Sequence, residues 1–155
     1  MTGLQKQRGV AAVELGILII PLMLIAFGIT EFGRAFFQYN ALVKGTRDAA
    51  RFLSAVGPLD SADPALNVFR AQAKCMVRYG NVDCSGALRV PLLTADMITI
   101  CDLWLCPDTH RDWPPPGGVL QLVTVTVSGY VFTPLAPFVM PSSLTFNPIS
   151  TTMRL

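Results

Sequence analysis

The residue whose chemistry fits its surroundings least is Glu14, the only charged residue in an apolar segment over 10–30. An ionised carboxylate at mid-membrane costs about 2.5–3.5 kcal/mol on insertion scales, and less near the headgroups. The carboxyl group can avoid this cost by protonation or by reaching the headgroups. It can also find a partner: if the chain were cut after Gly9, Val10 of a neighbouring subunit would offer a free α-amine. Such a pair is stronger in a low-dielectric bundle than in water, and it would set the axial register between subunits.

The four cysteines offer a second kind of chemistry, and they lie beyond the apolar segment as Cys75-x8-Cys84 and Cys101-x4-Cys106. Neither pair has the C-x-x-C spacing of zinc and thioredoxin-like signatures. An even count in a small domain outside the cytosol favours two disulfides. Three pairings are possible, and we expect the local one, in which each pair closes its own short loop. In the chain-entropy model each such loop adds about 2–3 kcal/mol of stability.

His110 is the only histidine, and its neighbours Asp108, Arg111 and Asp112 indicate an exposed polar loop. A metal site that combines His110 with the cysteines is the weaker alternative to disulfides, so we expect no metal and no other cofactor. The sequence has no G-x-S-x-G motif, no P-loop and no dinucleotide fingerprint. We therefore expect a protein without enzymatic activity.

The element that positions Glu14 is a membrane helix. The chain has 155 residues, enough for one domain plus an anchor, and the net charge of +2 is too small to indicate nucleic-acid binding. Residues 10–30 would form a helix about 31 Å long, which matches the hydrocarbon core of a bilayer. Lys6 and Arg8 before it favour a cytoplasmic N-terminus. We expect a retained helix in contact with lipid, loosened at Pro21, and a cleaved signal peptide is the alternative.

We expect this helix to pass the membrane at Glu31 and Arg34 and to end at about Val56, because Gly57-Pro58 follows. A stripe at helical spacing is expected to face the core, formed by Phe32, Phe36, Tyr39, Val43, Thr46, Ala50 and Leu53.

The remainder of the chain predicts a small head. A second helix is expected at 65–79, strands at 88–93 and 97–101, one long strand at 119–132, and an interrupted strand over 144–147 and 150–155. The predicted fold class is α+β: a long N-terminal helix packed on a small antiparallel sheet with one further helix.

Residues 8–52 resemble the N-terminal region of TadE-like proteins, the pseudopilins of the tight-adherence (Tad, or Flp pilus) system. The matching pieces are Arg8-Gly9 with Glu14, the proline in the apolar run, Glu31-Phe32-Gly33-Arg34, and Ala49-Ala50-Arg51. The resemblance covers about a third of the chain. It implies a prepilin leader at 1–9, a transmembrane and assembly helix at 10–30, its periplasmic continuation at 31–57, and a head domain at 58–155.

The resemblance also implies a function and partners. A prepilin peptidase would cut between Gly9 and Val10, and the mature minor pilin would stay in the inner membrane with its head in the periplasm. Its helix would contact other pilin and pseudopilin subunits and the pilus assembly platform, and it could enter an extracellular pilus. Two alternatives remain: a single-pass anchored periplasmic binding or scaffold protein, and a periplasmic thiol-redox protein that uses Cys101 and Cys106.

Overall fold

The computed structural model describes residues 7–114, 118–136 and 143–155. Most of the expected leader, residues 1–6, therefore lies outside the described residues. The chain divides into two compact units. We call Met1–Phe36 with Thr133–Leu144 the N-terminal unit, and Phe37–Phe132 with Thr145–Leu155 the head unit.

The first helix, α1, spans Gln7–Val56 and contains Pro21 without an interruption of the helix. Its end is set by Gly57, which has a φ of +78° and donates its N–H to the Leu53 carbonyl at 3.2 Å. A residue in this left-handed conformation after the last turn stops a helix, and glycine adopts that conformation without the clash that a Cβ would cause. The predicted end of the helix at Val56 is confirmed.

The head unit contains a three-stranded antiparallel sheet in the order β1-β2-β5, formed by β1 (Ile98–Cys101), β2 (Leu122–Val127) and β5 (Ile149–Arg154). The central strand alternates valine and threonine, and its valines are buried while its threonines are not. This follows from the two-residue period of a strand, which sends successive side chains to opposite faces. The sheet therefore has one apolar face and one polar face.

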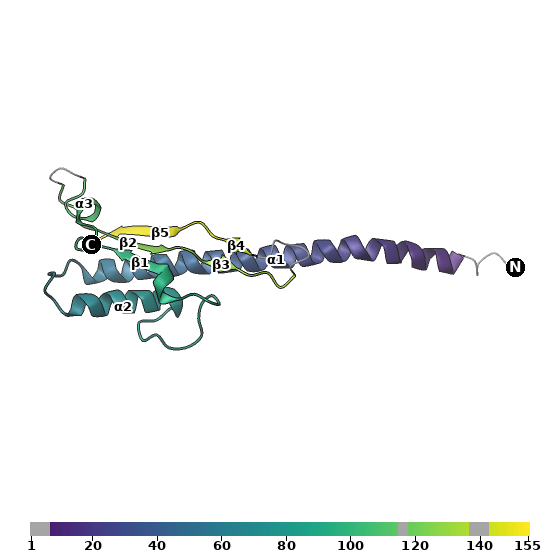
Figure 1. Ribbon diagram of the computed structural model, residues 1–155, viewed down its shortest axis with the longest axis horizontal. Coiled ribbons are helices and arrows are strands. Elements are labelled where there is room, and N and C mark those ends of the chain that lie inside the picture. The colour runs from purple at the N-terminus through teal and green to yellow at the C-terminus, as the bar shows by residue number, and fades with distance from the viewer. Residues whose placement is uncertain (1–6, 115–117, 137–142) are drawn as a thin grey trace. The chain divides into compact units, whose positions relative to one another are not determined.

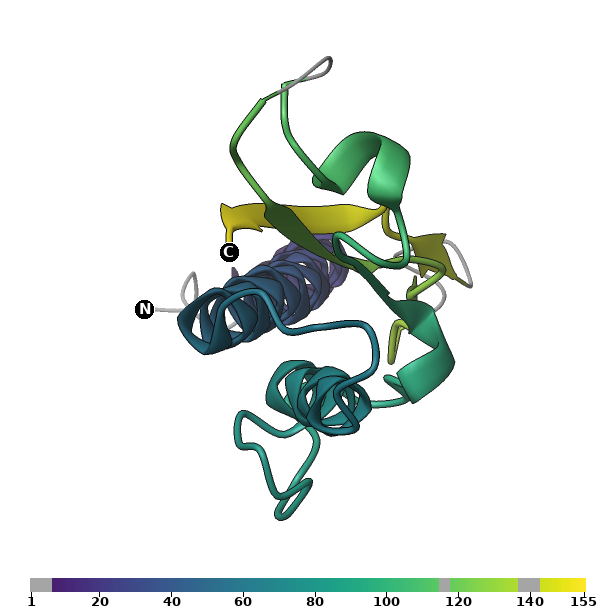
Figure 2. The same cartoon turned by 90° about the vertical axis from the view of Figure 1, so that its left-hand side faces the viewer.

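Two helices cover the apolar face: the part of α1 that belongs to the head unit and α2 (Ala65–Arg78). Both lie on the same side of the sheet (Figures 1 and 2). The Ala65 N–H donates to the Asp63 carboxylate at 2.8 Å, which satisfies one of the free donors at the start of α2. The shared core joins Leu42, Ala49 and Leu53 of α1 to Val77 of α2 and Val125 of β2.

The two helices approach each other closely at Gly45. A Cβ at this position would lie 3.0 Å from the Val77 carbonyl oxygen and 3.2 Å from the Val77 Cα. Only a residue without a side chain allows two helix backbones to approach so closely without displacement. Gly45 therefore sets the spacing between α1 and α2.

The opposite, polar face of the sheet carries α3 (Pro107–His110), on the other side from α1 and α2 (Figure 2). The described residues also include the 3-10 helix η1 (Ala95–Met97) and a two-stranded sheet of β3 (Val131–Phe132) and β4 (Leu144–Thr145). The fold class predicted from the sequence, α+β with a long apolar N-terminal helix, another helix and a small antiparallel sheet, is confirmed.

Two strand predictions need correction. Residues 88–93 form bends and turns instead of a strand, because Pro91 has no N–H to donate and Leu92 has a φ of +62°. The expected strand over 119–132 is two strands, since Gly129 has a φ of +71° and breaks the extended backbone between β2 and β3. The interrupted final strand is present, and its longer part, β5, pairs with β2.

The predicted core-facing stripe of α1 is also wrong in its first part. Phe32, Phe36 and Tyr39 are 65%, 70% and 41% exposed. The buried positions of this stretch are instead Glu31, Ala35, Gln38 and Leu42. These residues are also spaced by fours and threes. The predicted helical period is therefore correct, but a different face of α1 is buried.

Candidate functional site: the apolar N-terminal helix

The candidate functional site is the exposed apolar part of α1 within the N-terminal unit. Residues 9–27 and 29–30 are all exposed, and they are almost entirely apolar. By length and composition α1 could cross a membrane, over the range Gly9–Val56 and with a mean hydropathy of 2.6 in its most apolar window. No part of that window is buried within the protein. A helix that is apolar on all sides needs an apolar environment, such as lipid or other helices. It fits a single-pass membrane anchor.

Three of the predicted site residues lie in the first turns of this segment. Gly9, Val10 and Glu14 are all helical and exposed. Val10 and Glu14 are four residues apart, so they project from the same face of α1 with a rise of about 6 Å between them. A Cβ at Gly9 would meet nothing within 4 Å, so the fold does not require a glycine there. A glycine without a structural reason is compatible with recognition by another protein.

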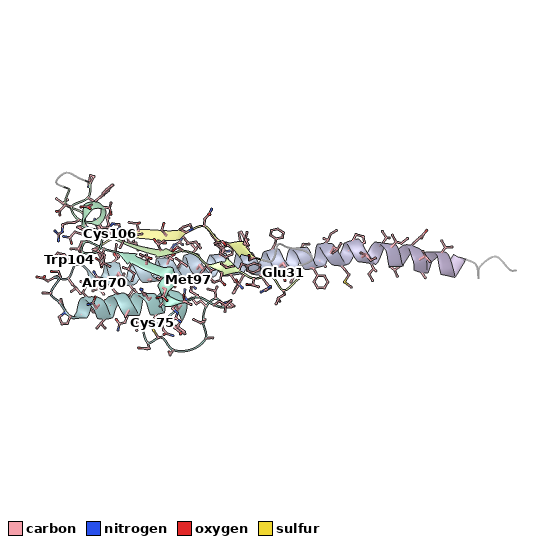
Figure 3. All side chains as sticks on the ribbon, in the orientation of Figure 1. Glu31, Arg70, Cys75, Met97, Trp104 and Cys106 are labelled. Carbon is pink, nitrogen blue, oxygen red and sulfur yellow. A yellow bond between two sulfur atoms is a disulfide. The ribbon has the colours of Figure 1, made fainter. Side chains whose placement is uncertain are left out.

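The apolar segment ends at Glu31, which is labelled on α1 in Figure 3, and this acidic side chain is buried. Its Oε1 accepts hydrogen bonds from the backbone N–H groups of Leu135 and Ala136, at 3.0 and 3.2 Å. Its Oε2 receives the Arg34 guanidinium at 2.7 Å. Both carboxylate oxygens thus have donors, which a buried carboxylate requires. Glu31 joins α1 to a segment more than a hundred residues away.

Sequence reasoning placed Glu31 and Arg34 at the membrane boundary but did not find their contact with Leu135. One local signal was present, because an acid and an arginine three residues apart on a helix are neighbours. That spacing indicates an ion pair, but it does not identify the backbone donors that complete the site. The segment that supplies those donors has no periodic pattern that would place it against a helix.

The head unit holds both cysteine pairs as disulfides, Cys75–Cys84 and Cys101–Cys106. This is the local pairing that the sequence favoured. The first bond ties the last turn of α2 to the loop that follows. The second closes the loop between β1 and α3, where Cys106 is labelled beside Trp104 in Figure 3. Each links residues close in sequence, with Cα–Cα distances of 4.8 and 5.4 Å.

Inside the second loop, Asp102 is buried and fully engaged. Its carboxylate binds the Arg70 guanidinium of α2 through two hydrogen bonds of 2.8 and 2.9 Å. It also accepts the backbone N–H groups of Trp104 and Leu105, at 2.9 and 3.0 Å. The Trp104 indole N–H donates to the Leu59 carbonyl at 2.9 Å. These bonds fix the loop against the end of α1 and α2.

His110 lies on the polar face of the sheet, at the end of α3. Its Nδ1 is 2.7 Å from the Thr109 hydroxyl, and its Nε2 is 2.7 Å from the Thr124 hydroxyl of β2. Burial lowers the pKa of His110 below its usual value near 6.5, and the negative charge of Asp102 partly opposes this shift. The imidazole is therefore neutral at pH 7, with both ring nitrogens in hydrogen bonds.

Comparison with known proteins gives one match. Residues 9–51 match the family model described as TadE-like protein. No curated protein and no solved structure matches the chain. The matched residues cover the exposed apolar segment with Glu14, the Glu31–Arg34 pair, and most of the α1 surface that packs in the head core. Through residues 9–51 the chain is similar to TadE-like proteins, and this match supports a TadE-like protein of the Tad pilus system.

Proposed function

We propose that this chain is a structural minor pilin or pseudopilin that takes part in assembly of a Tad pilus. The observation that carries the proposal is that the TadE-like match, residues 9–51, includes the whole exposed apolar segment of α1, residues 9–30. Such a helix can lie in lipid before assembly and against other pilin helices afterwards. The family is structural, and we propose no catalytic role for this chain.

The proposed maturation is a cut by a prepilin peptidase between Gly9 and Val10. Support comes from the exposure of both residues and from the acid at Glu14, on the same helix face as Val10. After the cut, the α-amine of Val10 would be a cation at the edge of the membrane. Glu14 of an adjacent subunit would neutralise it, and the pair would fix how far each subunit is advanced along the filament.

The proposed location is the bacterial inner membrane, with the N-terminus cytoplasmic and the head periplasmic. The two disulfides of the head support an oxidising compartment. In this arrangement Pro21 lies within the assembly helix, and neighbouring helices would cover the backbone groups that it leaves unpaired. The partners would be other pilins, the peptidase and the assembly platform.

The test is the N-terminus of the mature protein, measured by intact mass and N-terminal peptide mass spectrometry of protein from cells with a functional Tad system. We expect a chain that begins at Val10, and the full-length chain in cells that lack the peptidase. A chain that begins at Met1 in both strains, or that is cut after Ala26, would support an anchored periplasmic binding or scaffold protein instead. Either of these results would exclude the pilin proposal.

A further inference from the structure

We propose that Cys101, Cys106 and His110 form a redox-controlled site for Zn²⁺, which is closed while the two cysteines are joined and opens when they are reduced. The ligand atoms of the three residues lie within 4.8 Å of one another, and all three residues are only partly buried. In the disulfide the sulfurs cannot act as thiolate ligands. The inference does not depend on the pilus role of the chain.

The fold brings the three residues together from two elements, β1 and α3. Cys101 is the last residue of β1 and is paired directly with Thr124 of β2. Directly opposed residues in an antiparallel pair point to the same face, and here it is the polar face, because Ile100 and Val125 point to the core. Thr124 in turn holds the His110 ring through Nε2.

The short helix α3 aligns the other two ligands. Cys106 precedes α3 and His110 ends it, and the His110 N–H donates to the Cys106 carbonyl at 2.9 Å. The spacing is C-x4-C-x3-H. It is not the C-x-x-C spacing, but its first part lies at the upper end of the wider range that zinc ligand pairs use, C-x2-4-C.

The chemistry of the donor set favours zinc. Two thiolates and one imidazole are ligands for a tetrahedral, borderline-soft cation, and three protein ligands leave the fourth position to water. Asp102 is not available for that position, because its carboxylate is already bound by Arg70 and by two backbone N–H groups.

Each ring nitrogen of His110 has a threonine hydroxyl beside it. Whichever nitrogen binds the metal, the other keeps a hydroxyl that fixes the orientation of the ring, as outer partners of metal-bound histidines do. Bonds of about 2.3 Å to sulfur and 2.0 Å to nitrogen place tetrahedral ligand atoms roughly 3.3–3.8 Å apart. The three side chains would thus need to move by about an ångström, and the two sulfurs would separate as their bond opens.

The reaction has two steps. A dithiol reductant transfers two electrons and two protons to the disulfide, which becomes two thiols while the reductant becomes a disulfide. Zn²⁺ then displaces the two thiol protons into solvent and takes the His110 nitrogen as its third protein ligand. In the reverse direction a disulfide oxidant accepts two electrons from the two thiolates and, with two protons from solvent, becomes two thiols. The Cys101–Cys106 bond forms again and Zn²⁺ is released.

The Cys75–Cys84 pair provides a matched comparison, because the only histidine of the chain lies at the other pair. The test uses the full chain in detergent, as the double variant Cys75→Ser/Cys84→Ser, oxidised or reduced with a thiol-free phosphine that is then removed. Co²⁺ serves as the spectroscopic probe and Zn²⁺ as its competitor. We expect thiolate-to-cobalt absorption with one equivalent in the reduced protein only, and its loss when Zn²⁺ is added.

The decisive variant is His110→Asn, which should weaken metal binding by a factor of about 10 or more while both thiols remain. Circular dichroism monitors the fold. If reduction loosens the head, Zn²⁺ should restore the oxidised spectrum, because metal binding is coupled to folding. The proposal is overturned if the reduced protein gives no thiolate–cobalt band. It is also overturned if His110→Asn binds as tightly as the parent, or if Zn²⁺ fails to restore a loosened head.

Discussion

Glu31 and Leu135 are 104 residues apart in sequence, yet the Leu135 N–H donates to the Glu31 carboxylate at 3.0 Å. The same carboxylate oxygen accepts the Ala136 N–H, and the other oxygen receives Arg34. A buried acid at the end of the apolar segment is thus fully satisfied by groups of the N-terminal unit. Its role is to hold the segment that contains Leu135 and Ala136 against α1.

The first prediction concerns this contact. Glu31→Ala would leave two backbone N–H groups without an acceptor, a loss of about 1–3 kcal/mol of local stability. Hydrogen exchange at Leu135 and Ala136 should therefore accelerate by about 10–100-fold, as measured by exchange mass spectrometry of the detergent-solubilised chain. Glu31→Gln keeps one acceptor oxygen and should accelerate exchange less. Equal exchange in the parent and both variants would show that Glu31 does not hold the segment.

The second prediction tests the close approach of α1 and α2. Gly45→Ala would place a methyl group 3.0 Å from the Val77 carbonyl oxygen. Overpacking of this kind costs about 1–3 kcal/mol, while alanine in a helix gains about 1 kcal/mol over glycine. The net loss in the free energy of unfolding of the head is expected to be about 0–2 kcal/mol, measured by chemical denaturation.

Gly33→Ala is the matched control, because it lies on the same helix and its added Cβ would meet nothing within 4 Å. It should leave stability unchanged or raise it by up to about 1 kcal/mol. If both variants behave alike, the spacing of the two helices is not set by Gly45.

The sequence predicted the elements whose signals are local. The period of α1, its stop at Gly57, the helix at 65–78 and the alternation of β2 were all readable, because each depends on neighbouring residues. The buried face of α1 was not readable in its first part. Glu31 and Gln38 are buried there because distant groups satisfy them, Leu135 for the first and the Tyr130 hydroxyl, at 2.9 Å, for the second. A hydrophobic pattern selects the aromatic residues beside them instead.

The contrast between local signals and distant contacts also explains which parts of the candidate site could be predicted from the sequence. The apolar segment and Glu14 are recognisable from composition alone, since a charge in an apolar run is conspicuous. The group formed by Cys101, Cys106 and His110 is harder to recognise from the sequence, because it depends on the pairing of β1 with β2 and on the direction of α3. The bend at 88–93 was missed for a related reason. Val90 and Leu93 of this segment are buried, but the backbone turns at the exposed Leu92 instead of extending.

The third prediction concerns the ion pair between Arg70 and Asp102, whose side chains are 17% and 8% exposed. Asp102→Asn keeps the shape but leaves the guanidinium without its counter-charge in a buried place. Removal of one partner of a buried pair costs about 3–5 kcal/mol, and we expect a loss near the lower end because Arg70 keeps some contact with water. Thermal unfolding of the head reports the change.

The control is the more exposed pair between Arg89 and Asp48, whose side chains are 20% and 32% exposed. Asp48→Asn should cost only about 0–1 kcal/mol, as is usual for pairs that water can screen. A larger effect for Asp48→Asn than for Asp102→Asn would contradict the assignment of Asp102 as the main polar anchor of the loop.

The fourth prediction is a pH dependence from His110. Because burial lowers the pKa of His110 in the folded protein, the unfolded chain binds more protons between that lowered value and about 6.5. The free energy of unfolding should therefore decrease as the pH drops from 7 through this range. Above the range His110 should make no pH-dependent contribution. His110→Gln should remove this contribution, and the difference between the two proteins isolates it from the carboxylates. If the parent instead became more stable relative to His110→Gln as the pH falls, the effect would have the opposite sign and the prediction would be refuted.

The fifth prediction concerns Glu14 and assembly. Glu14→Ala should still be processed after Gly9, because the cut does not require the charge, but the subunit should assemble poorly. An amine and a carboxylate about 4 Å apart attract by roughly 4 kcal/mol at an effective dielectric constant of 20, which is enough to select one register over its neighbours. The measurement is the ratio of processed subunit in sheared filaments to that in the membrane.

Two control variants separate charge from shape. Glu14→Asp keeps the charge on a shorter side chain and should restore this ratio in part, whereas Glu14→Gln keeps the shape without the charge and should leave the ratio low. If Glu14→Gln assembled as well as the parent, the carboxylate would have to act through hydrogen bonding or packing, and the pairing with the Val10 amine would be ruled out.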